Sequence, residues 1–369
     1  MKTLDKKDKQ KNQQEMYSTD DMTALQAQFK AQEIAFAPIV FQVARLMLKW
    51  GIFELLDTHK KGLTMEEIVE KTALSEYAVK VLLESALTAK LVLKGINEPQ
   101  FTLSKTAWFL LHDEMVKVNL NFNHDVNYLG MFELEQSLIE GKPVGLKVFG
   151  DWKTIYEGLS QLPNQVQKSW FAFDHFYSDN AFDAALKIVF TSKTSTLLDV
   201  GGNTGKFASR CVAYSPQVKV TIMDLPQQIA LMRQQTQNVA GNDRIFAHPA
   251  DLLDITTVFP TGFDVIWMSQ FLDCFSKEQV ISILSRVSDA MSSSTRLYIM
   301  ETLWDRQRFP TASFCLAQIS LYFTALANGN SKMFNFNDIQ SYIESVGLNI
   351  VAIYDQLGLG HSLLEVRKK

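Results

Sequence analysis

The sequence has few cysteines, few histidines and no clear metal-ligand pattern. Its three cysteines, Cys211, Cys274 and Cys315, lie far apart and form no Cys-x-x-Cys pair, which argues against a disulfide framework or a cysteine zinc site. No histidines and acids recur at ligand spacing, so we expect no metal cofactor. The 36 basic and 40 acidic residues leave a formal charge of −4, which does not suggest non-specific binding to nucleic acid.

The amino-terminal part also lacks a targeting or membrane-spanning pattern. Residues 1–14 are polar and basic and contain no apolar run of the kind found in signal peptides. The most apolar early stretch, 34–56, contains Arg45, Lys49 and Glu54, which would be costly inside a bilayer. We therefore expect a cytoplasmic protein with no membrane partner.

What is present is the composition of an ordinary globular protein. Of the 369 residues, 47% are hydrophobic and 21% are charged, and this length is sufficient for two domains with separate cores. We expect a flexible tail at 1–24, a helical domain at 25–110, a helical connection at 111–190 and a ligand-binding α/β domain at 191–369.

The expected helices of the first half follow from apolar spacing. Between residues 22 and 56 apolar side chains recur every three or four positions, which predicts two helices broken near Pro38. Residues 111–190 are also expected to be mostly helical, with loops near 141–143 and 162–163.

A compact supersecondary pattern follows the first helices. Thr64 with Glu67 three residues later predicts a capped short helix, and Ser75 is expected to begin a second helix. The apolar runs 91–93 and 101–103, on either side of an Asn-Glu-Pro turn, predict a hairpin. Two helices followed by a two-stranded wing constitute a winged-helix arrangement.

Winged helices often bind DNA, so this function has to be weighed. The second helix carries Glu76, Lys80 and Glu84, and it has no arginine, asparagine or glutamine to read base edges. A structural or dimerisation role is therefore favoured, and a DNA-binding regulator that senses a cofactor stays as an alternative.

From Thr196 onward, strand, loop and helix patterns alternate. Seven apolar runs are expected to be strands: 197–198, 218–223, 244–247, 265–268, 297–300, 350–354 and 363–366. Helical segments separate most of them, which predicts a largely parallel sheet with helices on both faces, a Rossmann-like α/β fold. Only residues 357–360 separate the last two strands, so this pair should be an antiparallel hairpin.

A glycine-rich turn follows the first of these strands, in residues 199–207 (DVGGNTGKF). A strand that runs into such a turn and then a helix lets a ligand approach free backbone N–H groups closely. A phosphate-binding P-loop is excluded because Val200 and Phe207 stand where glycine and serine or threonine are required. The dinucleotide fingerprint is excluded because Asn203 and Lys206 occupy two of its glycine positions.

The remaining pattern, D-V-G-G-x-x-G, resembles motif I of class I S-adenosylmethionine-dependent methyltransferases. The resemblance implies that Asp199, Gly201, Gly202 and Gly205 bind S-adenosylmethionine.

The ends of the next strands carry residues suited to the same cofactor. Asp224 has two oxygens that can accept both ribose hydroxyls. Asp251 is placed to accept from the adenine amino group, with Leu225 and Leu252 against the ring faces. Ser269 matches a position near the methionine end of the cofactor.

Together with the winged-helix front end, these features resemble one family. It is the O-methyltransferases that include plant caffeate-type enzymes, hydroxyindole O-methyltransferase and bacterial polyketide-tailoring enzymes, and the similarity covers about residues 35–367. The resemblance implies a homodimer formed through the amino-terminal domain, with the connection at 111–190 capping the substrate pocket. It also implies methyl transfer to a small aromatic or polyketide-like acceptor, with S-adenosylhomocysteine as the product.

The catalytic positions depart from the family pattern. Asp273 stands where the family has a histidine base, Glu301 matches the acid that orients this base, and Met333 replaces a second acid. An aspartate with its ordinary pKa of about 4 is a weak base for a phenol of about 10. Burial beside Glu301 would raise the pKa of one of the two carboxyl groups through like-charge repulsion, so that the pair shares a proton and serves as the base. Several alternatives stay open. The acceptor hydroxyl is unusually acidic, another residue is the base, or Asp273 is purely structural. A further alternative is that this protein keeps the cofactor but carries out other chemistry.

Residues 173–177 resemble the substrate-lining segment of the family. We therefore expect Phe173, His175 and Tyr177 to contact the acceptor. His361 opens the last predicted strand and is a further candidate, because the start of an antiparallel strand lies at the ligand edge of the sheet.

Overall fold

The computed structural model describes residues 17–190 and 194–369, so most of the predicted tail at 1–24 lies outside the described residues. The chain divides into two compact units, one ending at His124 and the other comprising Asp125–Lys369. The predicted connection at 111–190 is thus divided between the two units, which are described separately below.

The first unit is helical apart from one hairpin. Its elements are α2 (Ala24–Ala35), α3 (Ala37–Lys49), α4 (Ile52–Thr58), α5 (Met65–Lys71), α6 (Glu76–Thr88), β1 (Val92–Lys94), β2 (Phe101–Leu103), α7 (Lys105–His112) and α8 (Glu114–Phe122). The expected break near Pro38 is present, at Phe36. The prediction of two helices before residue 57 was wrong, because Gly51 adopts a left-handed φ of 70° and begins a third helix, α4.

The predicted helix pair and hairpin are confirmed. β1 and β2 are antiparallel, with Val92 opposite Leu103. Thr64 and Glu67 form a reciprocal cap at the start of α5. The Glu67 N–H donates to Thr64 Oγ1 (3.2 Å), and the Thr64 N–H donates to Glu67 Oε2 (2.7 Å).

This cap supports a stability prediction. The variant Thr64→Ala removes the side-chain acceptor of an otherwise unsatisfied N–H, so we expect it to lower the free energy of unfolding by about 1 kcal/mol. Urea denaturation of the full chain measures this, with Lys61→Ala as the exposed neighbouring control. An equal loss of unfolding free energy in Thr64→Ala and Lys61→Ala would contradict the role of Thr64 as a helix cap.

The second unit begins with a series of short helices. They are α9 (Tyr128–Gly130), η2 (Met131–Glu133), α10 (Leu134–Glu140), η3 (Val144–Val148), α11 (Ile155–Gly158), η4 (Leu159–Gln161), α12 (Asn164–Ser178), η5 (Asp179–Ala181) and α13 (Phe182–Val189), and the π-helical η1 (Asn123–Asn127) precedes them. The predicted loops near 141–143 and 162–163 are present between these helices.

All seven predicted strands form one sheet in the order β5-β4-β3-β6-β7-β9-β8. The strands are β3 (Thr196–Val200), β4 (Lys219–Asp224), β5 (Ile245–Pro249), β6 (Val265–Ser269), β7 (Arg296–Glu301), β8 (Leu348–Leu357) and β9 (His361–Lys368). The first five are parallel, and β9 is antiparallel to both β7 and β8. The predicted carboxy-terminal hairpin is therefore confirmed, and the first residues of β9 lie beside the last residues of β7.

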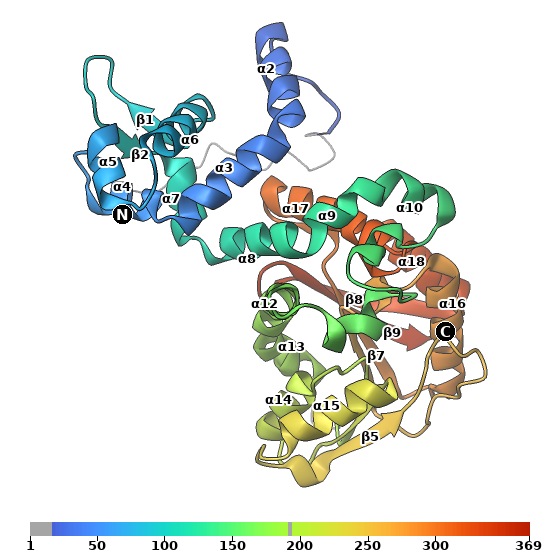
Figure 1. Ribbon diagram of the computed structural model, residues 1–369. Coiled ribbons are helices and arrows are strands. Elements are labelled where there is room, and N and C mark those ends of the chain that lie inside the picture. The colour runs from blue at the N-terminus through green and yellow to red at the C-terminus, as the bar shows by residue number, and fades with distance from the viewer. Residues whose placement is uncertain (1–16, 191–193) are drawn as a thin grey trace, which may run out of the picture. The chain divides into compact units, whose positions relative to one another are not determined.

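Helices cover both faces of the sheet (Figure 1). The helices that follow β3 are α14 (Lys206–Tyr214), α15 (Pro226–Thr236), α16 (Lys277–Ala290), α17 (Pro310–Tyr322) and α18 (Phe336–Ser345), with the π-helical η9 (Phe323–Ala327) after α17. One core layer packs α13, α14 and α15 against the sheet, and the other packs α16 and α18 against the opposite face.

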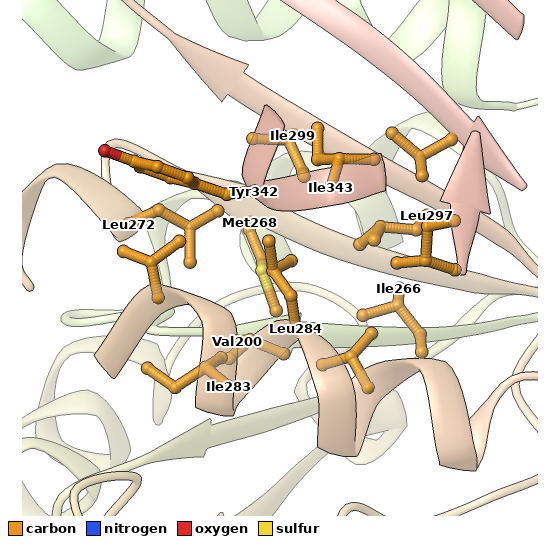
Figure 2. Packing of buried hydrophobic residues seen from close by; sticks show 14 of the residues in the cluster. Val200, Ile266, Met268, Leu272, Ile283, Leu284, Leu297, Ile299, Tyr342 and Ile343 are labelled. Carbon is orange, nitrogen blue, oxygen red and sulfur yellow. The ribbon is translucent and has the colours of Figure 1, made fainter. Parts of the chain in front are cut away.

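The layer under α16 and α18 anchors the strand ends that carry the site. Figure 2 shows Val200 and Met268 of the sheet beside Ile283 and Leu284 of α16. Leu272 belongs to the same cluster and is fully buried. Burial of such side chains contributes about 1.5–3 kcal/mol each, so the loop after β6 is held firmly to this core.

One helical stretch, Pro310–Ala327, is long and apolar enough to span a membrane, and 39% of it is buried inside the protein. Leu316 and Tyr322 lie on its buried side. We interpret it as a core helix of the second unit.

Candidate functional site

The glycine turn after β3 forms a cradle of exposed backbone. Gly201 has a φ of 75°, and a Cβ at this position would overlap the Phe271 ring. A Cβ at Gly202 would lie 2.8 Å from Asp199 Oδ2, and Gly205 caps the start of α14 in a left-handed conformation. Only glycine therefore leaves this turn open to a ligand while keeping it packed against its neighbours.

Asp224 lies at the end of β4 and is tied to the same turn. Its Oδ2 accepts the Asn203 N–H (2.8 Å), and its Oδ1 accepts the Leu225 N–H (2.7 Å). Burial raises the pKa of Asp224, and these two backbone donors lower it. The carboxylate is thus fixed beside the glycine turn, where the sequence predicted a ribose ligand.

The next loop carries Asp251 and Leu252. Asp251 is exposed and accepts the Leu253 N–H at Oδ1 (2.8 Å), while Leu252 is buried in the α16 core layer. Arg286 of α16 holds this loop by donating to the carbonyl oxygens of Leu252 (2.6 Å), Asp254 (3.0 Å) and Thr257 (3.1 Å).

Arg286 should therefore matter for cofactor affinity without touching the cofactor. We expect Arg286→Ala to free the 251–257 loop and raise the Kd for S-adenosylmethionine about tenfold, since hydrogen bonds from a charged donor contribute about 1.5–3 kcal/mol. Isothermal titration checks this, with the exposed Arg233→Ala as control. An unchanged Kd for S-adenosylmethionine in Arg286→Ala would show that the 251–257 loop is not part of the cofactor-binding site.

Three buried polar atoms near the glycine turn have no partner among residues 17–190 and 194–369. They are Asp199 Oδ2, Ser269 Oγ and Gln270 Oε1. Burial, and then the charge of Asp224, raise the pKa of Asp199 to about 8. Buried polar groups are normally satisfied, so this arrangement fits a ligand with a polar end, as S-adenosylmethionine has.

Asp273 lies in the short turn after β6 and is only 3% exposed. Its one side-chain partner in the described structure is the Cys274 thiol, with Sγ 3.6 Å from Oδ1. Burial raises the pKa of Asp273 to about 7; the Cys274 hydrogen bond lowers it by less, and the charge of Asp174 adds a smaller increase. A carboxyl group whose pKa is raised toward neutrality is a better proton acceptor than an ordinary aspartate.

Glu301 ends β7 and supports the Asp273 loop through its backbone. Glu301 Oε1 accepts the N–H groups of Phe271 (3.3 Å) and Leu272 (3.1 Å). Burial, and then the charge of Asp273, raise the pKa of Glu301 well above its usual range. Glu301 thus positions the loop that carries Asp273.

Sequence reasoning missed most of the groups around Asp273. Tyr322 of α17 is buried and Tyr156 of α11 is partly buried. The pKa values of both phenols are raised, mainly by desolvation, and Asp273 makes a smaller contribution in both cases. The Trp170 indole N–H donates to the Tyr322 hydroxyl (2.7 Å). Asp174 was also missed, although it lies inside the predicted segment 173–177, because its electrostatic link to Asp273 joins positions far apart in sequence.

The predicted acceptor-binding residues lie mainly along α12. The Phe173 and Tyr177 rings pack at 4.9 Å. His175 stacks on Phe171 at 5.9 Å, and its pKa is lowered by burial first and by Lys206 second. These side chains belong to the same helix as Asp174, and their contact with an acceptor stays a prediction.

His361 is placed differently from the other candidates. It is fully buried at the start of β9, opposite Leu357, and neither ring nitrogen has a partner in the described parts of the chain. Burial lowers the pKa of His361 to about 4, so the imidazole is neutral at pH 7. None of its described interactions reaches Asp273, and a contact with the acceptor remains a prediction.

Within the described ranges, no group of three or more histidine, cysteine or acidic side chains is arranged to hold a metal ion. The site therefore consists of a glycine cradle, acids at the ends of β4 and β7, and a buried acid–phenol cluster around Asp273.

Comparison with known families matches both units. The model of the Dimerisation2-like domain matches residues 28–101, and that of the O-methyltransferase domain matches residues 168–344.

Individual relatives are distant but cover most of the chain. The L-tyrosine C(3)-methyltransferase of Streptomyces lavendulae is 24% identical over 321 residues, which are 86% of this chain and 85% of that protein. The solved structure of a mitomycin 7-O-methyltransferase is 18% identical with a TM-score of 0.68, covering 93% of this chain and 98% of its own. An O-methyltransferase from neocarzinostatin biosynthesis has been solved with S-adenosylmethionine and 2-hydroxy-5-methyl naphthoic acid. It is 15% identical with a TM-score of 0.63, and the match covers 89% of this chain and 96% of that chain. These two structures share the fold with this chain.

Proposed function

Since the chain belongs to the S-adenosylmethionine-dependent O-methyltransferases with an amino-terminal dimerisation domain, we propose that it methylates a hydroxyl of a small aromatic acceptor with Asp273 as the base. The observation that carries this proposal is the buried Asp273, whose pKa is raised to about 7 by burial and by Asp174. A phenol with a pKa of about 10 loses its proton more readily to such a base than to an ordinary aspartate.

The residues that would hold the cofactor are those of the glycine turn and the strand ends. Gly201 and Gly202 leave the backbone accessible, Asp224 would meet the ribose hydroxyls, and Ser269 would meet the polar methionine end. When bound, S-adenosylmethionine supplies an electrophilic methyl group on a positively charged sulfur.

The chain itself has to position the acceptor and manage one proton. Asp273 would accept the proton of the acceptor hydroxyl. The electron pair of that oxygen would bond to the methyl carbon supplied by the bound cofactor while the carbon–sulfur bond breaks and its electron pair stays on sulfur. Glu301 holds the Asp273 loop through the N–H groups of Phe271 and Leu272, so the base keeps its place as charge develops. Positioning of this kind accounts for a large part of the rate in two-substrate reactions.

Product analysis tests the proposal. The purified protein is incubated with S-adenosylmethionine and a panel of monocyclic and bicyclic phenols, and S-adenosylhomocysteine is measured by mass spectrometry. We expect stoichiometric S-adenosylhomocysteine and aryl methyl ether with at least one phenol. Tight cofactor binding with no S-adenosylhomocysteine from any acceptor would favour a non-transferring relative.

Methylation of a ring carbon is a second candidate, because one relative is an L-tyrosine C(3)-methyltransferase. Removal of the phenolic proton places negative charge on the ortho carbon as well as on oxygen, so the same base serves the first step of both reactions. After the new carbon–carbon bond forms, the ring C–H proton is lost and the oxygen is reprotonated, which restores the phenol. NMR of the product separates them, since an aryl methyl ether and a ring methyl group have distinct carbon shifts.

The amino-terminal unit supports a homodimer. No residue of α2 is buried, and its exposed apolar side chains include Leu25, Phe29 and Ile34. An exposed apolar face of this kind commonly marks an interface.

The homodimer is tested on α2. The double variant Leu25→Glu/Ile34→Glu should shift the protein from dimer to monomer in light scattering, because it buries two charges in the interface. The control Ile96→Glu changes a fully exposed side chain at the hairpin turn and should remain dimeric. A wild-type monomer at micromolar concentration would overturn the homodimer.

A further inference from the structure

We propose that Asn328 and Cys274 act in series as positioning residues for Asp273: the Asn328 amide holds the Cys274 carbonyl group, and the Cys274 thiol orients the Asp273 carboxylate. This inference rests on the proposed function, because it concerns the base of the same methyl transfer. It adds to that function two residues that act on the reaction through Asp273 rather than by touching the substrate.

The turn that carries Asp273, residues 271–275, is attached to the rest of the second unit at both ends. Near its start, Glu301 Oε1 accepts the first two backbone N–H groups of the turn. Near its end, the Asn328 side-chain amide donates to the Cys274 carbonyl oxygen. Glu301 therefore fixes the first half of the turn, whereas the half that carries the Cys274 thiol is held by Asn328.

Asn328 is itself held in one orientation. It follows the π-helical η9, and its backbone N–H donates to the Phe323 carbonyl oxygen (3.1 Å). Its side-chain Oδ1 accepts the N–H groups of Asn330 (3.1 Å) and Ser331 (3.1 Å). Because these two donors bind the oxygen of the amide, its NH₂ group has to face Cys274. Irregular π-helical turns are frequent at functional sites, and this one ends at the residue that holds the turn of the base.

The Cys274 thiol is suited to donate to the base. Its Sγ lies 3.6 Å from Asp273 Oδ1, and among residues 17–190 and 194–369 it is the one side-chain partner of that carboxyl group. Burial, and then the charge of Asp273, raise the pKa of Cys274 well above its usual value, so the thiol keeps the proton that it donates. Contacts of this kind, from neighbours whose own positions are fixed, hold a reacting group in a productive orientation.

Loss of the thiol should affect both the geometry and the ionisation of Asp273. A small displacement of a reacting group lowers the rate strongly, because the productive arrangement is then rarely reached. Burial raises the pKa of Asp273 to about 7, and the Cys274 hydrogen bond lowers it by less. Without this donor the ionised form is less stable, so the midpoint of the Asp273 titration should move to higher pH. The other titratable groups that act on the pair are Tyr156 of α11, Asp174 of α12, Glu301 of β7 and Tyr322 of α17.

The variants Cys274→Ala and Asn328→Ala test the two steps through two measurements. The first is the titration of Asp273 in the protein saturated with S-adenosylhomocysteine, by NMR of aspartate labelled at the carboxyl carbon, with Asp273→Asn to assign the signal. The second is the single-turnover rate with saturating S-adenosylmethionine and a phenol acceptor. We expect both variants to raise the Asp273 midpoint and to lower the rate about three- to tenfold, the effect of one hydrogen bond, with an unchanged Kd for S-adenosylmethionine.

Further variants separate positioning from a general loss of structure. Cys274→Ser restores a donor on a shorter side chain, so its midpoint should lie between those of the wild type and Cys274→Ala. If the two residues act in series, the double variant should lose no more than the single variant with the larger effect. The controls Cys315→Ala, at a half-buried cysteine on α17, and Asn349→Ala, at an exposed position on β8, should match the wild type.

An Asp273 midpoint that stays unchanged in Cys274→Ala would overturn the inference, as would additive losses in the double variant. Because Cys274→Ala removes a single sulfur atom, the first of these outcomes is decided even where Asn328→Ala disturbs the fold. A midpoint that rises in Cys274→Ala, while the wild type forms no S-adenosylhomocysteine with any phenol, would support the positioning pair and count against the proposed function.

Discussion

The variant Asp273→Asn should lose about 10²- to 10⁴-fold in kcat, the usual contribution of a general base, with little change in the Kd for S-adenosylmethionine. Asparagine has nearly the same shape as aspartate but cannot accept the hydroxyl proton. The side chain is 3% exposed, and among residues 17–190 and 194–369 its one side-chain partner is the Cys274 thiol, so the substitution disturbs few contacts. Single-turnover kinetics with saturating cofactor measure the chemical step directly.

The control for this experiment is Asp289→Asn, an exposed position on α16, which should leave kcat unchanged. Thermal denaturation of both variants separates misfolding from loss of the base. If Asp273→Asn keeps its turnover with an intact fold, then Asp273 is structural, and the base has to be found elsewhere.

Gly201→Ala is expected to weaken S-adenosylmethionine binding at least about tenfold. The left-handed φ of 75° costs about 1–2 kcal/mol with any Cβ, and the new methyl group would overlap the Phe271 ring. Overpacking of this kind costs about 1–3 kcal/mol. Because Gly201 is part of the glycine turn, the displacement of the Phe271 ring would distort the backbone that is expected to bind the cofactor. A factor of ten in affinity corresponds to about 1.4 kcal/mol.

The matched control is Gly262→Ala. Gly262 has a φ of 87°, and apart from its own chain neighbours no atom of the described residues lies within 4 Å of the position of an added Cβ. It therefore carries the backbone strain without the overlap, so its melting temperature should fall while its cofactor affinity stays the same. Equal loss of affinity in both variants would show that general destabilisation, rather than the cradle, explains Gly201→Ala.

The centre of the sheet could be predicted from the sequence because its central strands β6 and β7 are buried on both faces. Residues 265–268 and 297–300 are continuous apolar runs with no alternation, as expected for central parallel strands. The short segment 357–360 fixed the last pair as antiparallel. The helix count before residue 57 was harder to predict, because the apolar periodicity continues across Gly51 and hides the break.

The cofactor side of the site was predictable because its residues follow successive strands. Asp199, Asp224 and Ser269 lie at the carboxyl ends of β3, β4 and β6, and parallel strands bring such ends to one edge of a sheet. The positions of these residues at the ends of predicted strands were therefore sufficient to predict that they lie at one edge of the sheet.

The acceptor side was not predictable in the same way. Tyr156, Asp174 and Tyr322 come from three helices, and no local pattern links them to Asp273. Their effect on Asp273 depends on burial and on separation in space, both of which follow from tertiary packing. The sequence predicted that like-charge repulsion would raise the pKa of one carboxyl group of the Asp273–Glu301 pair, and in the structure the charge of Asp273 adds to burial in raising the pKa of Glu301. The contribution of Asp174 to the pKa of Asp273 could not be predicted.

The pH dependence of the chemical step tests the central claim most directly. Burial and Asp174 raise the pKa of Asp273 to about 7, and a base is active only when deprotonated. The single-turnover rate should therefore fall about tenfold per pH unit below this value and level off above it. Cys274 and Asp174 act on the pKa of Asp273, and Asp273 in turn acts on Glu301, Tyr156 and Tyr322, so these groups should shift the midpoint without removing it. The account predicts this midpoint in the wild type and its absence in Asp273→Asn, whereas a flat wild-type profile between pH 5 and 9 would contradict it.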